Sequence, residues 1–186
     1  YSHLADKFQS KNIETPFPRI KYEDAINTYG TDKPDTRFDL NIKILDNELS
    51  GTEFNVFNNS IKDGGTIRGL SVPKNESMTR KFYDKLNEFV RSIGGDGIIP
   101  ISIDNDLSGI EFEDIKSPIS KFLSVEHVKK IFNIFNSDSD DVILICAGKK
   151  NIVLDCLGQV RNKLAKDFEL IDEEKLNFLF VTDFPL

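Results

Sequence analysis

Residues 53–168 switch repeatedly between two hydrophobic periodicities, and this pattern constrains the fold more than any other feature of the sequence. Three segments carry apolar residues on one helical face and are predicted to be amphipathic helices: residues 77–93, 124–135 and 151–168. Four short apolar or alternating runs are predicted to be strands: residues 53–58, 66–72, 98–103 and 142–147, the first two as a hairpin. This order predicts an α+β fold, a two-layer sandwich of an antiparallel sheet with helices on one face.

The segments on either side of this region have simpler patterns. Apolar spacing at Leu4 and Phe8 predicts the end of a helix in residues 1–12. Residues 22–29 repeat apolar positions at helical intervals up to Gly30, which suits the left-handed residue that follows a helix. Two further strands are predicted, at residues 38–45 from strict alternation and at residues 178–181 from a short apolar run.

The composition narrows the class of protein. The 186 residues are 39% hydrophobic and 30% charged, as in a soluble globular protein. A formal net charge of −7 excludes a general nucleic-acid binder, so contact with RNA must come from a local basic patch. No run approaches the ~20 apolar residues that span a bilayer. Cys146 and Cys156 lie in apolar runs, which predicts buried, reduced thiols in a cytoplasmic protein.

The two ends of the sequence carry an expectation of their own. The first residues include neither an initiator Met nor a signal peptide, and the last residues stop directly after an apolar run. We therefore expect both ends to lie inside a longer protein.

Motifs that carry chemistry are weak in this sequence. Residues 94–97 (GGDG) follow a predicted helix and precede a predicted strand, the reverse of a phosphate-binding loop, so they are interpreted as a helix end and turn. The acidic residues in 104–114 lack the EF-hand spacing and are interpreted as a solvated loop. His3 and His127 have no metal-ligand spacing. We predict no catalytic residue, no substrate-binding residue and no metal site within the chain.

Local groups of basic residues are the candidates for contact with phosphates. They are Arg80, Lys81, Lys149, Lys150 and Arg161. The alternative is that these side chains form the ordinary polar faces of amphipathic helices, which touch only solvent.

Residues 15–38 read TPFPRIKYEDAINTYGTDKPDTRF and resemble a block of the bacterial-type aspartyl-tRNA synthetases, with Thr31 and Thr36 in place of the usual Ser and Leu. Three more segments resemble the same family in the same order: residues 77–81 (SMTRK), 115–123 (IKSPISKFL) and 180–186 (FVTDFPL). The set covers nearly the whole chain, and its order makes it specific where each member alone is weak.

The resemblance implies a class II synthetase that uses ATP and Mg²⁺ to activate aspartate and then charges tRNA, as a cytoplasmic homodimer. It implies that residues 46–170 form the insertion (GAD) domain, between a catalytic-domain segment in residues 1–45 and a return strand in residues 171–186. The family's ATP-binding and aspartate-selecting elements match nothing in this chain, so the chain alone is expected to be an inactive monomer without cofactor, membrane or DNA partner.

The resemblance also implies which residues lie near the active site of the whole enzyme. They are Asp32, Lys33, Asp35, Arg37 and Asp183. The alternative is structural: a salt-bridged loop at residues 32–37 and a hydrogen-bonding residue at the end of a strand.

Two other functions stay open at this point. One is a structural or protein-interaction module that never touches RNA, as the negative charge suggests. The other is the subunit of a tRNA-dependent amidotransferase that shares the insertion fold, although residues 29–38 and 182–185 favour the synthetase.

Overall fold

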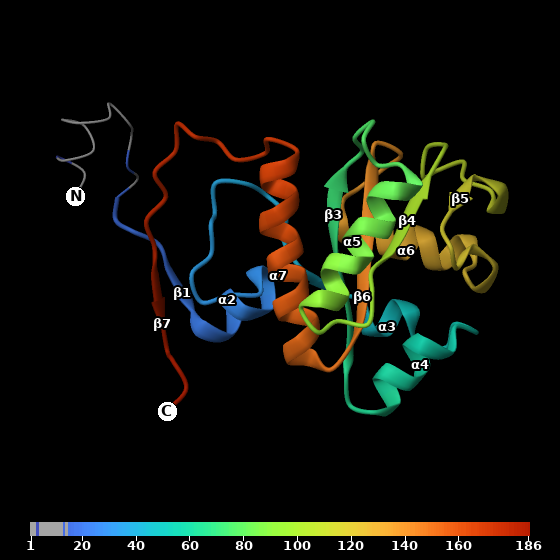
Figure 1. Cartoon of the computed structure of the whole chain (residues 1–186), viewed down its shortest axis with the longest axis horizontal. Helices are drawn as coiled ribbons and strands as arrows, with labels where there is room; N and C mark the ends of the chain where they lie inside the picture. The colour runs from blue at the N-terminus through green and yellow to red at the C-terminus, as the bar shows by residue number, and fades with distance from the viewer. Residues whose placement is uncertain (1–2, 4–12, 14) are drawn as a thin grey trace.

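A five-stranded antiparallel sheet lies at the centre of the fold, in the order β2-β3-β6-β4-β5. We describe residues 3, 13 and 15–186 of a computed structural model (Figure 1). Its elements are β1 (Arg19–Lys21), α2 (Tyr22–Tyr29), β2 (Lys43–Ile44), α3 (Asp46–Leu49), α4 (Asn55–Lys62), β3 (Thr66–Pro73), α5 (Arg80–Ser92), β4 (Ile99–Ile103), β5 (Ile115–Lys116), α6 (Val125–Phe135), β6 (Asp141–Gly148), α7 (Lys150–Asp167) and β7 (Phe180–Thr182), with 3₁₀ turns at Phe112–Asp114 and Ser120–Phe122.

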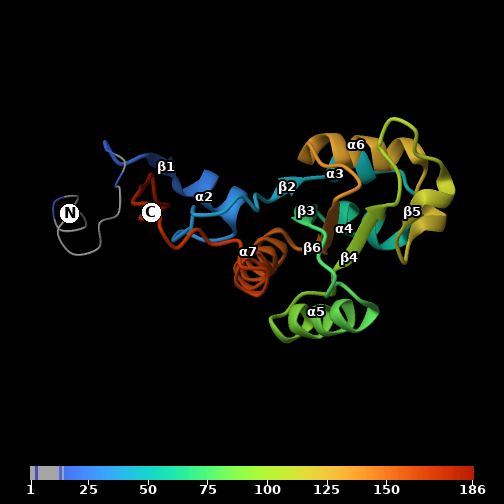
Figure 2. The ribbon, with the colours of Figure 1, turned by 90° about the horizontal axis from the view of Figure 1, so that it is seen from above.

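Strand β6 shows why helices cover both faces of this sheet. Its apolar side chains alternate: Val142 and Leu144 pack with α5 and α7, while Ile143 and Ile145 pack with α3, α4 and α6. Seen from above, α5 and α7 lie on one side of the sheet and α3 and α6 on the other (Figure 2). A strand that is apolar at every position is buried on both faces. The predicted α+β class with an antiparallel sheet is confirmed. The prediction that helices cover only one face of the sheet was wrong, because α3, α4 and α6 cover the second face.

Most of the predicted elements are present. The predicted helices correspond to α2, α5, α6 and α7, and the predicted strands at 66–72, 98–103, 142–147 and 178–181 correspond to β3, β4, β6 and β7. The expected helix end at Leu4 and Phe8 lies outside the described residues. Gly30 follows α2 with φ of 71°, as predicted.

Two of the predicted strands need correction. Residues 53–58 run into the first turn of α4, which begins at Asn55, because Phe57 and Ile61 pack inward one helical turn apart while Val56 is 45% exposed. Strand β3 therefore pairs with β2 and β6, and residues 53–58 are not its hairpin partner. Of residues 38–45, only Lys43–Ile44 join the sheet, as β2. The rest of that segment lies across α7 without regular secondary structure, with Phe38 and Leu40 buried.

A second, two-stranded sheet lies beside the main fold. Strands β1 and β7 pair in parallel, with Arg19 opposite Phe180 and Lys21 opposite Thr182. Helix α2 packs on both strands, and the Tyr22 ring contacts the Phe184 ring at a tilt of 45°, with centroids 5.0 Å apart. In the part of the chain that the structure describes, no helix has the length and apolarity needed to cross a bilayer.

Helix α6 begins with a reciprocal cap that gives a first testable prediction. The Ser124 hydroxyl accepts a hydrogen bond from the His127 amide at 3.1 Å, and His127 Nδ1 accepts one from the Ser124 amide at 3.2 Å. Ser124→Ala is expected to lower the free energy of unfolding by about 1 kcal/mol. Ser77→Ala is the matched control, because the N-cap position of α5 is Thr79, so the Ser77 side chain does not stand at the N-cap of that helix. Urea denaturation measures both variants. An equal loss of stability in Ser77→Ala and Ser124→Ala would contradict the assignment of Ser124 as the cap of α6.

Candidate functional site at the junction of α7 with residues 29–42

Arg161 of α7 lies at the centre of the contact between the helix and the segment that follows α2. Its side chain has 0% exposure. Nε donates to the carbonyl oxygen of Leu40 at 2.8 Å, and Nη2 donates to the carbonyl oxygens of Asp35 at 2.7 Å and Phe38 at 3.1 Å. Burial lowers the pKa of Arg161 to about 10, so the guanidinium stays charged at neutral pH.

Two aromatic rings complete the surroundings of this guanidinium. Its carbon lies 4.0 Å from the ring centroid of Phe38 and 4.9 Å from that of Tyr29. A cation over an aromatic face is stabilised by the ring quadrupole, and more so when water is excluded. The rings and carbonyls together compensate the buried charge.

One helical turn before Arg161, the backbones of α2 and α7 meet at two glycines. A Cβ at Gly30 would lie 2.7 Å from Gly158 Cα, and a Cβ at Gly158 would lie 3.0 Å from Gly30 Cα. Glycine is the residue that permits this approach, and at Gly30 it also permits the positive φ. Residues 29–42 are thus held to α7 at two points, the glycine contact and Arg161.

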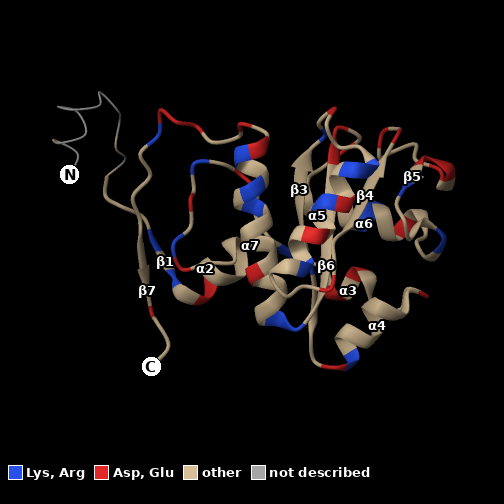
Figure 3. Ribbon diagram, in the orientation of Figure 1, with Lys and Arg blue, Asp and Glu red and all other residues tan. Residues whose placement is uncertain are grey.

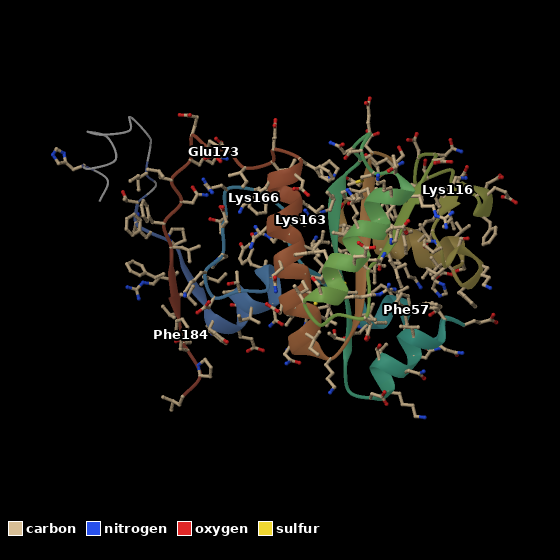
Figure 4. The ribbon with its side chains drawn as sticks, viewed as in Figure 1. Phe57, Lys116, Lys163, Lys166, Glu173 and Phe184 are labelled. Atoms are coloured by element: carbon tan, nitrogen blue, oxygen red, sulfur yellow. The ribbon has the colours of Figure 1, made fainter. Side chains whose placement is uncertain are left out.

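The segment held in this way presents the ion pair of Asp35 and Arg37. Arg37 donates from Nε and Nη2 to the two carboxylate oxygens of Asp35, at 2.9 and 2.7 Å. The hydrogen bonds from the Arg37 side chain lower the pKa of Asp35, so this carboxylate stays charged well into the acidic range. Glu173 lies 3.5 Å from Arg37 Nη1, on the chain that leaves α7 (Figure 4).

Only part of the predicted active-site shell comes together. Lys33, Asp35 and Arg37 line one open depression of about 300 Å³, together with residues 175–178. Asp183 lies elsewhere, directly after β7, and Asp32 is not among the lining residues. In the described residues no group of three or more His, Cys, Asp or Glu could hold a metal ion. Since Arg37 takes both Asp35 oxygens, the residues present do not fit a Mg²⁺ site.

The predicted phosphate-contact residues divide into an exposed set and one buried exception. Arg80 and Lys81 lie in the first turn of α5, and Lys149 and Lys150 at the start of α7; all four are exposed. In Figure 3, basic and acidic residues alternate along the ribbon of these helices. Arg161 is the correction: it is buried with its donors on backbone carbonyls, so it cannot reach a phosphate from this position.

The two exposed basic pairs lie at opposite ends of α5. Lys149 lines a small cavity with residues 94–97, which follow the helix, whereas Arg80 begins it. The 13 residues of α5 place the two pairs about 20 Å apart. Arg80 lines a separate groove of about 540 Å³ between α5, β4 and residues 116–118, where the segments SMTRK and IKSPISKFL meet.

The two cysteines lie in the core, as predicted. Cys146 and Cys156 are free and buried, and burial raises the pKa of both thiols. A raised pKa leaves little reactive thiolate at neutral pH, so these residues fit a packing role.

The sequence contains one signal for this junction that none of the motifs above includes. Arg161 follows Leu157 by four residues and precedes Leu164 by three, which places it on the apolar face of its own helix. A charged residue on such a face is almost never buried unless paired. That position indicates a buried partner more strongly than it indicates contact with RNA.

Comparison with known proteins gives a consistent assignment. The family model described as the GAD domain matches residues 57–157, more than half of the chain. The aspartate–tRNA(Asp/Asn) ligase of Caldanaerobacter subterraneus subsp. tengcongensis is 41% identical over 184 residues, which cover 99% of this chain and 30% of that protein. The aspartate–tRNA ligase of Halalkalibacterium halodurans is 40% identical over 176 residues, or 94% of this chain and 28% of that protein.

The chain therefore spans about 30% of the length of the curated relatives that it matches. The match to the family model ends at residue 157, one turn before Arg161, while the similarity to the ligases continues through both flanking segments. The chain is thus similar to one internal region of bacterial aspartate–tRNA ligases, and it belongs to the GAD domain family.

Proposed function

We propose that this chain is the insertion-domain region of an aspartate–tRNA ligase, which activates aspartate with ATP and transfers it to tRNA. The observation that carries the proposal is 41% identity over 99% of the chain, flanks included. An amidotransferase subunit would account for the GAD match alone, not for the flanking similarity. We propose residues 46–170 as the insertion domain, with residues 1–45 and 171–186 as parts of the catalytic domain.

The chain on its own is proposed to be inactive, with aspartate, ATP and Mg²⁺ bound by other parts of a cytoplasmic homodimer. The test is aspartate-dependent exchange between ATP and pyrophosphate, measured for the purified chain and for the full-length protein. Exchange by the full-length protein alone supports the proposal. Exchange by the isolated chain would contradict its inactivity, and no exchange by either would contradict the ligase assignment.

The role proposed for the domain itself is accessory: it supports the catalytic domain through the α7 junction and guides the approach of the tRNA acceptor arm. The support for the second part is the exposure of Arg80, Lys81, Lys149 and Lys150 near helix N-termini, where backbone amides also favour anions. The alternative is a purely structural module, and the net charge of −7 favours it.

Charge reversal separates these two roles. In the full-length enzyme, Lys149→Glu with Lys150→Glu is expected to raise the KM for tRNA roughly tenfold at low salt and to reduce the salt slope of binding by about 1.8. The matched control is Lys121→Glu with Lys130→Glu, which has the same change of charge on the other face of the sheet. If the KM for tRNA changes equally, or not at all, in the two double variants, the structural role is favoured.

A further inference from the structure

The hydrogen bonds that join Arg161 to the segment after α2 are made to backbone carbonyls, not to side chains. Its three shorter hydrogen bonds end on the carbonyl oxygens of Asp35, Phe38 and Leu40. A guanidinium presents its donors in fixed directions within one plane. Three carbonyls within six residues can satisfy those directions only when the segment follows one path.

This path decides where the Asp35–Arg37 pair lies. Asp35 contributes its carbonyl oxygen to Arg161 and its carboxylate to Arg37, so one residue joins the two interactions. Phe38, directly after Arg37, is buried under the guanidinium. The ion pair itself is partly exposed at the depression lined by Lys33 and Arg37. Helix α7 therefore holds the buried side of residues 35–40, while the Asp35–Arg37 pair on the opposite side faces solvent.

We infer that Arg161 is a positioning residue: through it, α7 of the proposed insertion domain sets the path of residues 35–40 and thereby the orientation of the Asp35–Arg37 pair. Any effect of Arg161 on catalysis rests on the proposed ligase function. Its effect on the path of residues 35–40 does not depend on that proposal. On this inference the proposed insertion domain acts on the enzyme through buried Arg161 and through the contact of Gly158 with Gly30, in addition to any contact with RNA.

Trypsin gives a local readout on the chain itself, because it cleaves after Arg37 only when residues 35–40 leave α7. Arg161→Lys keeps the charge but loses the planar set of donors, and Arg161→Met removes both. Each is expected to accelerate cleavage between Arg37 and Phe38 at least about tenfold. Cleavage after Arg68, which is buried in β3, reports global unfolding, and Lys166→Met on the exposed side of α7 is the matched control.

The outcomes separate positioning from general stability. Faster cleavage at Arg37 with unchanged cleavage at Arg68 supports the inference. Equal acceleration at both sites, or none at Arg37, overturns it. If Arg161→Met does not fold, Arg161→Lys and Phe38→Leu answer the same question, since Phe38→Leu removes the ring contact from the side of the segment.

The full-length enzyme tests the catalytic consequence. Arg161→Lys is expected to lower kcat for aspartate-dependent ATP–pyrophosphate exchange about tenfold or more while the KM for tRNA stays unchanged, and Lys166→Met is expected to alter neither. An active wild type with unchanged kcat in Arg161→Lys would overturn the link to the active site. An inactive wild type whose Arg161→Lys variant still shows local cleavage at Arg37 would instead refute the ligase proposal and leave the positioning role standing.

Discussion

Gly30→Ala is expected to destabilise the chain by about 3 kcal/mol or more, because it introduces backbone strain and overpacking at one position. Gly30 has φ of 71°, a conformation in which a Cβ is disfavoured. The added carbon would also lie inside van der Waals contact of the Leu154 carbonyl oxygen and 2.7 Å from Gly158 Cα. The junction between α2 and α7 would have to open, and urea denaturation measures the loss.

Gly64→Ala is the control that separates strain from contact. Gly64 has φ of 74°, nearly the value at Gly30, but a Cβ there would meet nothing within 4 Å. Its replacement is expected to cost only about 1 kcal/mol, the strain alone. Similar losses for the two variants would mean that the close approach of Gly30 to Gly158 contributes little to stability.

Phe57→Ala is expected to cost about 3 to 5 kcal/mol in the free energy of unfolding, the range found when a buried aromatic side chain leaves a cavity. Phe57 is fully buried between α4 and the sheet (Figure 4). Its ring meets that of Phe54 edge-on, with centroids 4.9 Å apart. Val56, 45% exposed on the same helix, is the control, and Val56→Ala is expected to change stability by less than about 0.5 kcal/mol. The reverse order of effects would support the strand first predicted for residues 53–58.

The long periodic segments were the predictable part of this fold. Helices α5 and α7 have 13 and 18 residues, enough turns for an apolar face to identify them. Helix α4 has only eight residues, and the apolar residues at 54, 56 and 57 fit alternation as well as a helix. A short run of this kind carries too few positions to distinguish the two periods, and only packing against the sheet decides between them.

The junction was not predictable for a different reason. The path of residues 35–40 depends on hydrogen bonds to Arg161, which lies 121 to 126 residues further along the chain. No local pattern encodes such a contact. The position of Arg161 on the apolar face of its helix nonetheless indicates a buried arginine with a partner. The prediction that it is a surface cation overlooked this position. Grouping residues 32–37 as a salt-bridged loop agrees with the Asp35–Arg37 pair.

The parallel pairing of β1 with β7 has a consequence for how such a protein changes over evolution. Parallel neighbours need a crossover connection, and α2, packed on both strands, already provides the helix of a β-α-β unit. Residues 31–179 are then one long insertion in the connection between α2 and β7, and both ends of this insertion lie near the small sheet of β1 and β7. This insertion can therefore change in length or be replaced during evolution while β1 and β7 stay paired. The condition is that the replacement still provides a surface on which the turn after α2 can pack, as α7 does here.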